Sequence, residues 1–529
     1  MRRKAVKIVF LFFAFLVLTV LASVSEAKTI YVPDDYEKIQ WAVDNASAGD
    51  TIVVRDGTYV ENIDINKPHL TIKSENGSAN CVVQAKNSHD HVFEVTADNV
   101  TIKGFTVTGA SSSWKAGIHL YNSNNCRIEN VNASNNWYGI HFYNSSNNII
   151  ADNIVSSNDW GDGIYLYSSS NNIIANNTAS SNNWCGIRLR YSNNNIIANN
   201  NASSNDWGDG IYLYQSSNNI IANNTVSNNY DGIELWSSSN NNIIANNNAS
   251  SNDDYGIALG KSSNNTIANN TVLSNWCGIH LGSSSNNIIA NNTVSSNNYD
   301  GIDLYYCSNN IIANNTASNN DDGIHLGSSS NNIITNNTAS SNNEDGIYLA
   351  YSSKNTIANN TVSDNDDGIY LWYSSKNTIA DNIVSSNNWC GIRLRYSNNN
   401  IIYLNNFIDN TDNVYSYAST SIWNSTEKIT YTYNGSQYTN YLGNYWSDYA
   451  GSDANGDGIG DTPYSIDSDK DNYPLMRPFE YYFVPEEPIV SISTDKYEYR
   501  AGDVMLINIT FENPTDESKS VKFLWILDI

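Results

Sequence analysis

The chain has 529 residues, of which 53 are acidic and 27 basic, so its formal net charge at pH 7 is -26. A field of that sign repels nucleic acids and anionic lipids, whereas cations and neutral partners are favoured. It also disfavours polyanionic sugars such as pectate or alginate as substrates, unless bound calcium supplies positive charge.

Residues 1–27 have the pattern of a secretory signal peptide. Basic residues at 2–4 precede an apolar run from Ile8 to Leu21, and Ser25-Glu26-Ala27 offers a small-x-small cleavage site. This run is too short to span a bilayer core of about 30 Å comfortably, and no later segment is long and apolar enough to do so. We therefore expect a secreted or cell-surface protein with no transmembrane span in the mature chain.

Residues 28–107 are expected to form an N-terminal cap and the first turns of the next domain. The segment 36–46 carries Ile39, Trp41, Ala42 and Val43 at a spacing that fits an amphipathic helix, and short strands are expected at 51–54 and 69–72. Such a cap covers the open end of a core and blocks edge-to-edge aggregation.

From residue 108 to 410 the chain repeats a unit of about 23 residues. The phrase Gly-Ile-x-Leu begins at Gly117 and recurs twelve times to Gly391, at intervals of 22 to 24 residues, with Phe142 once in place of Leu. So strict a period predicts a solenoid. One period, such as 163–183, contains three short strands separated by Ser/Asn-rich corners and no helical pattern. We predict an all-β fold, a parallel β-helix with three strands per turn around one apolar core.

The asparagines and cysteines fit the same stacking. Asn falls nine residues after the repeat glycine in twelve of thirteen turns, as at Asn148 and Asn172, and stacked amides can hydrogen-bond along the axis. Cys185, Cys277 and Cys390 each precede a repeat glycine, four or five turns apart. At ~4.8 Å per turn that is about 20 Å, well beyond the ~7 Å reach of a disulfide. We predict a structural Asn ladder and buried free thiols.

Residues 411–484 form the terminal turns and an Asp/Gly-rich closing segment. There Asp453, Asn455, Asp457 and Asp461 alternate as in an EF-hand-type loop, but Tyr464 replaces the bidentate Glu, so the pattern fits a calcium site or an unliganded turn. Alternation in 490–492, 504–511 and 521–525 predicts the start of a β-sandwich over 489–529. A complete sandwich needs about 100 residues, so we expect this domain to be truncated.

Acidic residues gather directly before the repeat glycine in four successive turns. Carboxylates about 5 Å apart raise one another's pKa unless a cation such as Ca²⁺ intervenes, and a pair can serve glycoside hydrolysis. Asp-Gly is equally ordinary turn chemistry, and earlier turns carry Asp at the same position. The candidate metal ligands are Asp300, Asp321, Asp322, Glu344, Asp345, Asp366 and Asp367, and the candidate catalytic residues are Asp322, Asp345 and Asp367.

Aromatic and imidazole side chains occupy outward positions of the Gly-Ile-x-Leu strand. Aromatic rings there can stack on sugars or simply ladder within a sheet. The candidates for glycan contact are Tyr165, Tyr167, Tyr212, Tyr214, Trp236, Tyr348, Tyr370 and Trp372. His119 and His141 share one outward column in adjacent turns. They fit either a copper or zinc site or an incidental exposed pair. No nucleophile elbow or phosphate-binding glycine loop is recognisable.

Several segments together resemble a known family. The start Thr29-Ile30-Tyr31-Val32, the Gly-Ile repeats, and the closing stretches 443–449 (Gly-Asn-Tyr-Trp-Ser-Asp-Tyr) and 456–461 (Gly-Asp-Gly-Ile-Gly-Asp) resemble NosD-like proteins over about residues 29–475. These are pectin-lyase-like right-handed β-helices, also called carbohydrate-binding and sugar-hydrolysis domains. The Asn-rich version followed by a β-sandwich resembles cell-surface proteins of methanogenic archaea. The resemblance implies a right-handed solenoid, but it leaves the activity open.

We therefore expect an exported cell-surface protein that binds glycans, cations or envelope components without catalysis. The resemblance keeps two alternatives: a polysaccharide hydrolase, lyase or epimerase that uses stacked carboxylates, and a periplasmic copper-binding or copper-delivery protein. Many Asn-x-Ser/Thr acceptors for glycosylation lie in the repeat, such as Asn176, Asn223, Asn269, Asn291, Asn314, Asn336 and Asn359.

Overall fold

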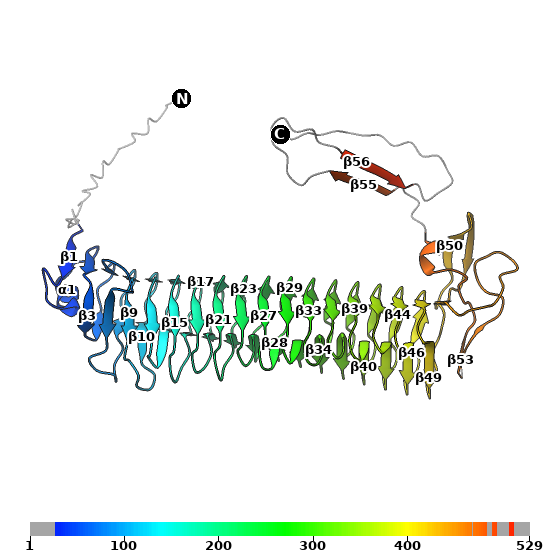
Figure 1. The fold of residues 1–529 in the computed structure, drawn as a ribbon, viewed down its shortest axis with the longest axis horizontal. Coiled ribbons are helices and arrows are strands. Elements are labelled where there is room, and N and C mark those ends of the chain that lie inside the picture. Colours follow the sequence, from blue (N-terminus) through cyan, green and yellow to red (C-terminus); the bar gives the residue numbers. More distant parts are fainter. Residues whose placement is uncertain (1–26, 468, 484–488, 495–506, 513–529) are drawn as a thin grey trace, which may run out of the picture.

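The computed structural model describes residues 27–467, 469–483, 489–494 and 507–512. The predicted signal peptide, apart from its last residue, and the predicted strand at 521–525 lie outside the described residues. Three long parallel sheets run the length of an elongated solenoid (Figure 1), which confirms the predicted parallel β-helix. No helix in the described ranges is long and apolar enough to cross a membrane.

Each turn contributes one strand to each sheet. In one turn β25 (Ile233–Trp236) leads to β26 (Ile243–Ala245) and β27 (Asn248–Ser250), after which β28 (Tyr255–Gly260) lies parallel to β25. The first, second and third sheets have seventeen, sixteen and seventeen strands. Residues one period apart are therefore paired neighbours, as predicted.

The second sheet carries every Gly-Ile-x-Leu phrase. Its strands are β4 (Ile63–Ile65), β7 (Phe93–Val95), β10 (Ala116–Tyr121), β13 (Tyr138–Tyr143), β16 (Ile164–Tyr167), β19 (Ile187–Arg190), β22 (Ile211–Tyr214), β25, β28, β31 (Cys277–Gly282), β34 (Ile302–Tyr305), β37 (Ile324–Gly327), β40 (Asp345–Ala350), β43 (Asp367–Trp372), β46 (Cys390–Arg395) and β49 (Asp412–Tyr417).

The first and third sheets are built from the two shorter strands of each turn. The first sheet contains β1 (Thr29–Val32), β2 (Thr51–Val54), β5 (Thr71–Ser74), β8 (Thr101–Lys103), β11 (Arg127–Glu129), β14 (Ile149–Ala151), β17 (Ile173–Ala175), β20 (Ile196–Ala198), β23 (Ile220–Ala222), β26, β29 (Thr266–Ala268), β32 (Ile288–Ala290), β35 (Ile311–Ala313), β38 (Ile333–Thr335), β41 (Thr356–Ala358), β44 (Thr378–Ala380) and β47 (Ile401–Tyr403). The third contains β3 (Gly57–Val60), β6 (Cys81–Gln84), β9 (Thr106–Thr108), β12 (Asn132–Ser134), β15 (Ile154–Ser156), β18 (Thr178–Ser180), β21 (Asn201–Ser203), β24 (Thr225–Ser227), β27, β30 (Thr271–Leu273), β33 (Thr293–Ser295), β36 (Thr316–Ser318), β39 (Thr338–Ser340), β42 (Thr361–Ser363), β45 (Ile383–Ser385), β48 (Asn406–Ile408) and β52 (Tyr445–Trp446).

Apolar side chains and asparagine amides hold the turns together. One continuous core contains the Ile and Leu of every Gly-Ile-x-Leu strand. The predicted Asn ladder is confirmed, since Asn172 Nδ2 donates to Asn195 Oδ1 at 3.1 Å. The sequence prediction missed two further Asn ladders, one at each remaining corner, which run through Asn270 and Asn205. All six cysteines are buried and free.

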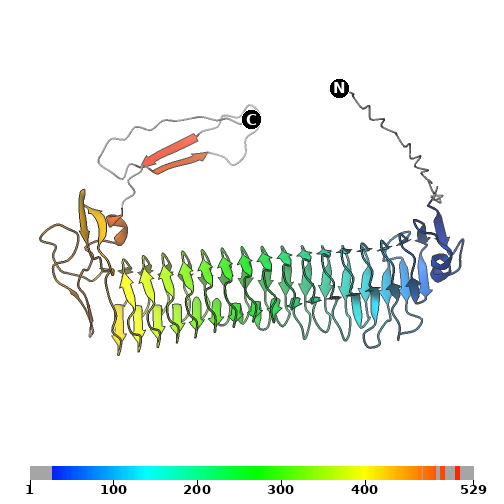
Figure 2. The same ribbon diagram turned by 180° about the vertical axis from the view of Figure 1, so that it is seen from behind.

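Different caps close the two ends of the solenoid, seen from the opposite side in Figure 2. At the N-terminal end, α1 (Ile39–Asn45) is shorter than the expected 36–46 helix, and its Trp41 is 45% exposed instead of buried. At the other end the hairpin of β50 (Ile429–Tyr433) and β51 (Ser436–Asn440) packs with the 3₁₀ helix η1 (Phe479–Tyr482) in a second apolar cluster.

Two further hairpins lie beyond the last regular turn. β53 (Tyr464–Ile466) pairs with β54 (Asp469–Asp471). β55 (Ile489–Thr494) pairs with β56 (Ile507–Glu512) where sandwich strands were expected.

Candidate functional site

The outward face of the second sheet carries nearly all the chemistry-bearing side chains of the repeat. Each Gly-Ile-x-Leu strand presents two outward residues, which form two parallel files because the strands are in register. The first file, two residues after the glycine, contains Glu234, Ala258, His280 and Asp303. The second file, four residues after the glycine, contains tyrosines, tryptophans and two arginines, interrupted by three glycines and one alanine.

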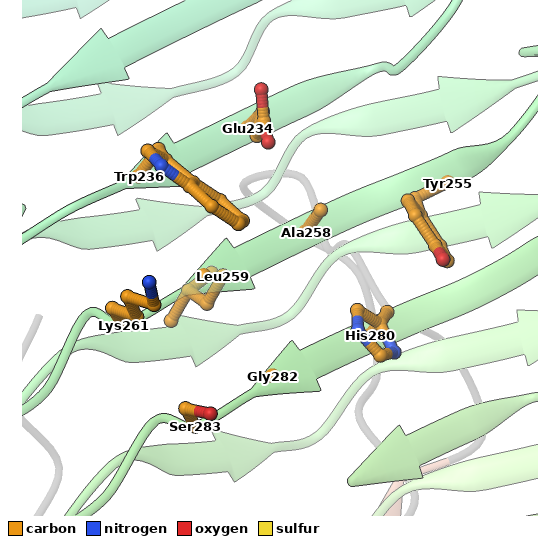
Figure 3. A pocket seen from close by; sticks show the side chains of 10 residues that line it. Glu234, Trp236, Tyr255, Ala258, Leu259, Lys261, His280, Gly282 and Ser283 are labelled. Carbon is orange, nitrogen blue, oxygen red and sulfur yellow. The ribbon is translucent and has the colours of Figure 1, made fainter. Parts of the chain in front are cut away.

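The glycines of the second file open a hollow of about 290 Å³ on this face (Figure 3). The indole of Trp236 lies across Gly260, where an added Cβ would meet its ring at 1.9 Å. Tyr305 likewise lies across Gly327, where an added Cβ would meet its ring at 2.7 Å. Gly282 lies between Gly260 and Tyr305 in this file and stays open, since a Cβ added there would meet only His280 Nε2, at 3.3 Å. The Trp236 ring, 40% exposed, thus lines a recess that only small residues permit. The Tyr305 ring, 46% exposed, lies one strand beyond Gly282 and covers Gly327, on the other side of its own strand.

Polar groups line the same recess. His280 Nδ1 lies 2.7 Å from Asp303 Oδ2, and the His280 ring stacks on Tyr255 with centroids 4.6 Å apart. Glu234 and Lys261 stand at the Trp236 side, with Lys261 Nζ 5.9 Å from the indole ring. The recess therefore combines aromatic faces with both hydrogen-bond donors and acceptors.

A group of three carboxyl side chains separates this hollow from a second one of about 250 Å³. Oxygens of Asp209, Asp231 and Glu234 all lie within 4.8 Å of one another. Burial raises the pKa of Asp231 to about 8, although the Tyr255 backbone N–H donates to its Oδ1 at 2.8 Å. Burial and the neighbouring carboxylates also raise the pKa of Asp209 well above its usual value. At neutral pH these carboxyl side chains are therefore partly protonated, next to the two hollows.

Sequence reasoning had noted Asp209 and Asp231 only as turn residues and had not singled out Glu234 as a site residue. The signal lay in the three-residue spacing of Asp231 and Glu234, which places a corner carboxyl beside an outward strand carboxyl. Recognising it requires the direction of the corner side chain, which the repeat pattern does not supply.

The predicted carboxylate strip divides into a buried and a more exposed column. Asp300, Asp322, Asp345 and Asp367 are buried, whereas Glu344 and Asp366 are exposed and Asp321 is half-buried. Two of the four buried residues bond to the backbone of the next turn: Asp322 Oδ1 accepts the Asp345 N–H at 2.9 Å, and Asp367 Oδ1 accepts that of Cys390 at 3.1 Å. Asp367 Oδ2 also accepts from Arg393 Nη1 at 2.9 Å. These contacts support the turn interpretation.

Only two members of the strip join a group that brings three ligand atoms within 4.8 Å, and they do so with a histidine. His325 Nδ1 lies 3.1 Å from Asp300 Oδ2 and 3.3 Å from Asp303 Oδ1. Burial lowers the pKa of His325, but the hydrogen bonds that its ring donates to these carboxylates outweigh burial and raise the pKa to about 10. A protonated imidazole thus already balances the acidic charge at this point.

The closing loop is folded on its own carboxylates. Asp453 accepts backbone N–H bonds from Gly456 at 2.7 Å and Gly458 at 2.8 Å, and Asp461 Oδ2 accepts one from Ala454 at 2.7 Å. The Asn455 side-chain amide donates to Asp457 Oδ2 at 3.1 Å. Calcium binding by this loop stays a prediction.

The aromatic candidates are not equivalent. Tyr165 is 5% exposed and packs with Ala116 and Tyr138, so it does not form an open platform. Tyr348 and Tyr370 stack on each other in the first file, with centroids 5.0 Å apart. The remaining candidates lie in the second outward file, except Tyr212 in the first, and are half-buried or exposed: Tyr167, Tyr212, Tyr214, Trp236 and Trp372.

His119 and His141 are paired neighbours as expected, but they are 9% and 8% exposed and do not form an exposed pair. The backbone N–H of Ala116 donates to His91 Nδ1 at 3.0 Å, so the proton of a neutral His91 lies on Nε2. That Nε2 lies 3.0 Å from His119 Nδ1 and donates to it. The facing nitrogens are therefore committed to this hydrogen bond.

The chain matches two family models. The model described as periplasmic copper-binding protein (NosD) matches residues 294–451. The model described as right handed beta helix region matches residues 45–173 and 116–272. A cell surface glycoprotein of Methanothermus fervidus is 38% identical over 117 residues, which is 22% of this chain and 18% of that protein.

Two solved structures share the architecture at low similarity. The A-module of the mannuronan C-5 epimerase AlgE4 of Azotobacter vinelandii is 16% identical with a TM-score of 0.37, and the match covers 67% of this chain and 100% of that one. The catalytic domain of a GH87 alpha-1,3-glucanase is 17% identical with a TM-score of 0.41, covering 68% and 66%. Such values have no bearing on substrate or reaction.

The stacked sheets and the second family match define a right-handed parallel β-helix protein. Together with the copper-protein match and the glycoprotein relative, they make the chain a NosD-like member of that class.

The residues of the segment that matches the copper-binding family do not fit a copper site. Residues 294–451 contain one histidine, His325, and no methionine. His325 is held protonated, and burial raises the pKa of the Cys307 thiol to about 11. A copper ion needs deprotonated imidazole or thiolate ligands, and His325 and Cys307 do not offer them.

Proposed function

We propose that the chain is an exported cell-surface protein that binds neutral glycans on the outward face of the second sheet. The observation that carries the proposal is the pair of rings, Trp236 over Gly260 and Tyr305 over Gly327, with the open Gly282 between them. The rings stand three turns apart, ~14 Å at ~4.8 Å per turn. That span accommodates more than one sugar ring.

The chemistry of the recess suits a neutral sugar. Pyranose rings stack their apolar faces on indole and phenol rings, which are amphipathic. Their hydroxyl groups can donate to Glu234 and accept from Lys261. The acidic groups and the net charge of -26 disfavour uronates at this position. Export is supported by the signal-peptide pattern and by the relative described as a cell surface glycoprotein.

A glycan array followed by calorimetry on the best neutral oligosaccharide tests the proposal. Trp236→Ala should weaken binding at least tenfold, about 1.4 kcal/mol, and Tyr305→Ala should act in the same direction. Trp41→Ala is the matched control, because Trp41 is similarly exposed at 45% but lies on α1 at the N-terminal cap. Equal affinities in Trp236→Ala and Trp41→Ala would rule out this site.

A second candidate function is cleavage of the bound glycan. It is favoured by the cluster of three carboxyl side chains beside the recess. Two carboxyl groups about 5 Å apart, one protonated, are the arrangement that retaining glycosidases use. Asp209, Asp231 and Glu234 offer such a pair, with oxygens within 4.8 Å. Asp231→Asn, at the member of the cluster that does not line the recess, would then abolish product release from the bound oligosaccharide and leave its affinity within about threefold. Absence of any product from the unaltered protein would dismiss the enzyme and leave the binding proposal intact.

A further inference from the structure

The outward face of the first sheet is apolar and uncharged over eleven neighbouring strands, β14 to β44. One outward file holds Ile or Thr and the other holds Ala or Thr. Seven of the isoleucines are each between 38 and 43% exposed: Ile173, Ile196, Ile220, Ile243, Ile288, Ile311 and Ile333. We call this surface, the outward residues of β14 to β44, the isoleucine strip.

Charged residues mark where the isoleucine strip begins. The preceding strand β11 presents Arg127 and Glu129 outward. The other two faces of the solenoid differ in kind: the second sheet carries Asp, Glu, Arg and His, and the third presents mainly Thr, Asn and Ser. Among the three faces described, the isoleucine strip would lose the fewest hydrogen bonds on leaving water, because its only polar outward side chains are four threonines.

The size of the isoleucine strip is that of an interface. Eleven strands about 4.8 Å apart extend over ~50 Å, and two files about 7 Å apart with their side chains make the strip ~10 Å wide. This area of ~500 Å² approaches the ~800 Å² per partner of a standard interface once the flanking corner residues are included. A scattered isoleucine needs no explanation, but a continuous patch of this size does.

Charge argues for a second copy of this chain as the occupant. Two copies, each with a net charge of -26, repel one another most where acidic residues face each other. Approach through the uncharged isoleucine strip keeps the acidic second sheets of both copies far apart. A strongly charged partner would gain nothing from a surface without charge.

We propose that two copies of the chain pack face to face through the isoleucine strip, related by a two-fold axis parallel to the solenoid axis. Such an axis places the Ile file of one protomer over the Ala file of its partner, large side chains against small ones. An axis along the strands would instead put Ile against Ile. Both copies have the same strand spacing, so the contacts stay in step over all eleven strands, with the sheets about 10 Å apart.

Sedimentation velocity on the exported chain at about 100 µM, far above a micromolar Kd, tests the dimer. Ile220→Lys with Ile243→Lys should halve the measured mass. The matched control, Thr225→Lys with Asn248→Lys, adds the same charge to the third sheet in the same two turns and should remain dimeric. Unchanged far-ultraviolet circular dichroism verifies that each variant is folded. A monomeric unaltered protein, or a dimeric Ile220→Lys/Ile243→Lys variant, would overturn the proposal.

Disulfide trapping tests the axis, because the six native cysteines are buried. The double variant Ile220→Cys/Ala222→Cys should form a covalent dimer under mild oxidation, since these two positions face each other across the proposed axis. Ile220→Cys alone should not. Efficient trapping by the single variant would contradict the axis and indicate Ile against Ile. Neither result depends on glycan binding, so failure here and failure of the proposed function are distinguishable.

Discussion

Removing one amide from a buried Asn ladder should destabilise the protein far more than removing its exposed neighbour. Asn270 Oδ1 accepts from the Asn247 backbone N–H at 2.9 Å, and Asn270 Nδ2 donates to the Ile244 carbonyl at 2.9 Å and to Asn292 Oδ1 at 3.0 Å. In Asn270→Ala the Asn247 N–H and the Ile244 carbonyl lose these partners inside the solenoid. At ~1–3 kcal/mol for each of the two buried unpaired groups, the free energy of unfolding should fall by about 2–6 kcal/mol.

Asn269→Gly provides the matched control. Asn269 is exposed at the adjacent position and has φ 57°, a left-handed conformation that glycine adopts without strain. We expect a change below about 0.5 kcal/mol for this variant. Urea unfolding followed by circular dichroism measures both, with the slope of the transition checked for equality. If Asn270→Ala and Asn269→Gly unfold within about 0.5 kcal/mol of each other, the ladders do not stabilise the solenoid as argued.

Three further predictions concern titration, thiols and the recess. Burial raises the pKa of Asp231 from 3.8 to about 8, so the stability contributed by its protonated form is complete below about pH 4 and is lost as the pH rises to 8. Urea unfolding across this range should show the loss, and Asp231→Asn should make the free energy of unfolding less dependent on pH. Burial raises the pKa of Cys81 to about 12 and of Cys126 to about 11, so a thiol reagent should label neither until urea unfolds the chain, and labelling of the folded protein would contradict the buried assignment. Gly260→Ala should displace the Trp236 indole, whose ring an added Cβ would meet at 1.9 Å, changing its fluorescence and weakening glycan binding at least tenfold; unaltered affinity would count against a role for that ring.

The fold was accessible from the sequence because its period is strict. Every Gly-Ile-x-Leu phrase supplies two core residues and fixes the register, so the pairing of Asp345 with Asp367 follows from counting residues. The cap helix was placed within three residues at its start, but Trp41 was assigned to the buried face. Its exposure depends on how the helix sits on the first turns, which periodicity does not specify.

The candidate site was less accessible, because it depends on side-chain direction across turns. The carboxylate strip was found as a run of Asp-Gly pairs, yet two of its four buried carboxyl groups bond to backbone N–H groups of the next turn, and two contact basic side chains. The recess arises from what is missing: Gly260, Gly282 and Gly327 interrupt an aromatic file, and two rings fold over two of them. Glu234 acquires its carboxyl neighbours only once the corner residues are placed in space.

A crystal structure of the chain with the neutral oligosaccharide selected on the array tests the central claim most directly. We expect a sugar ring over Gly282, stacked on Trp236 or Tyr305, with its hydroxyl groups within hydrogen-bond distance of Glu234 or Lys261. A sugar bound on the first or third sheet, or at either cap, with this recess left to solvent, would contradict the account.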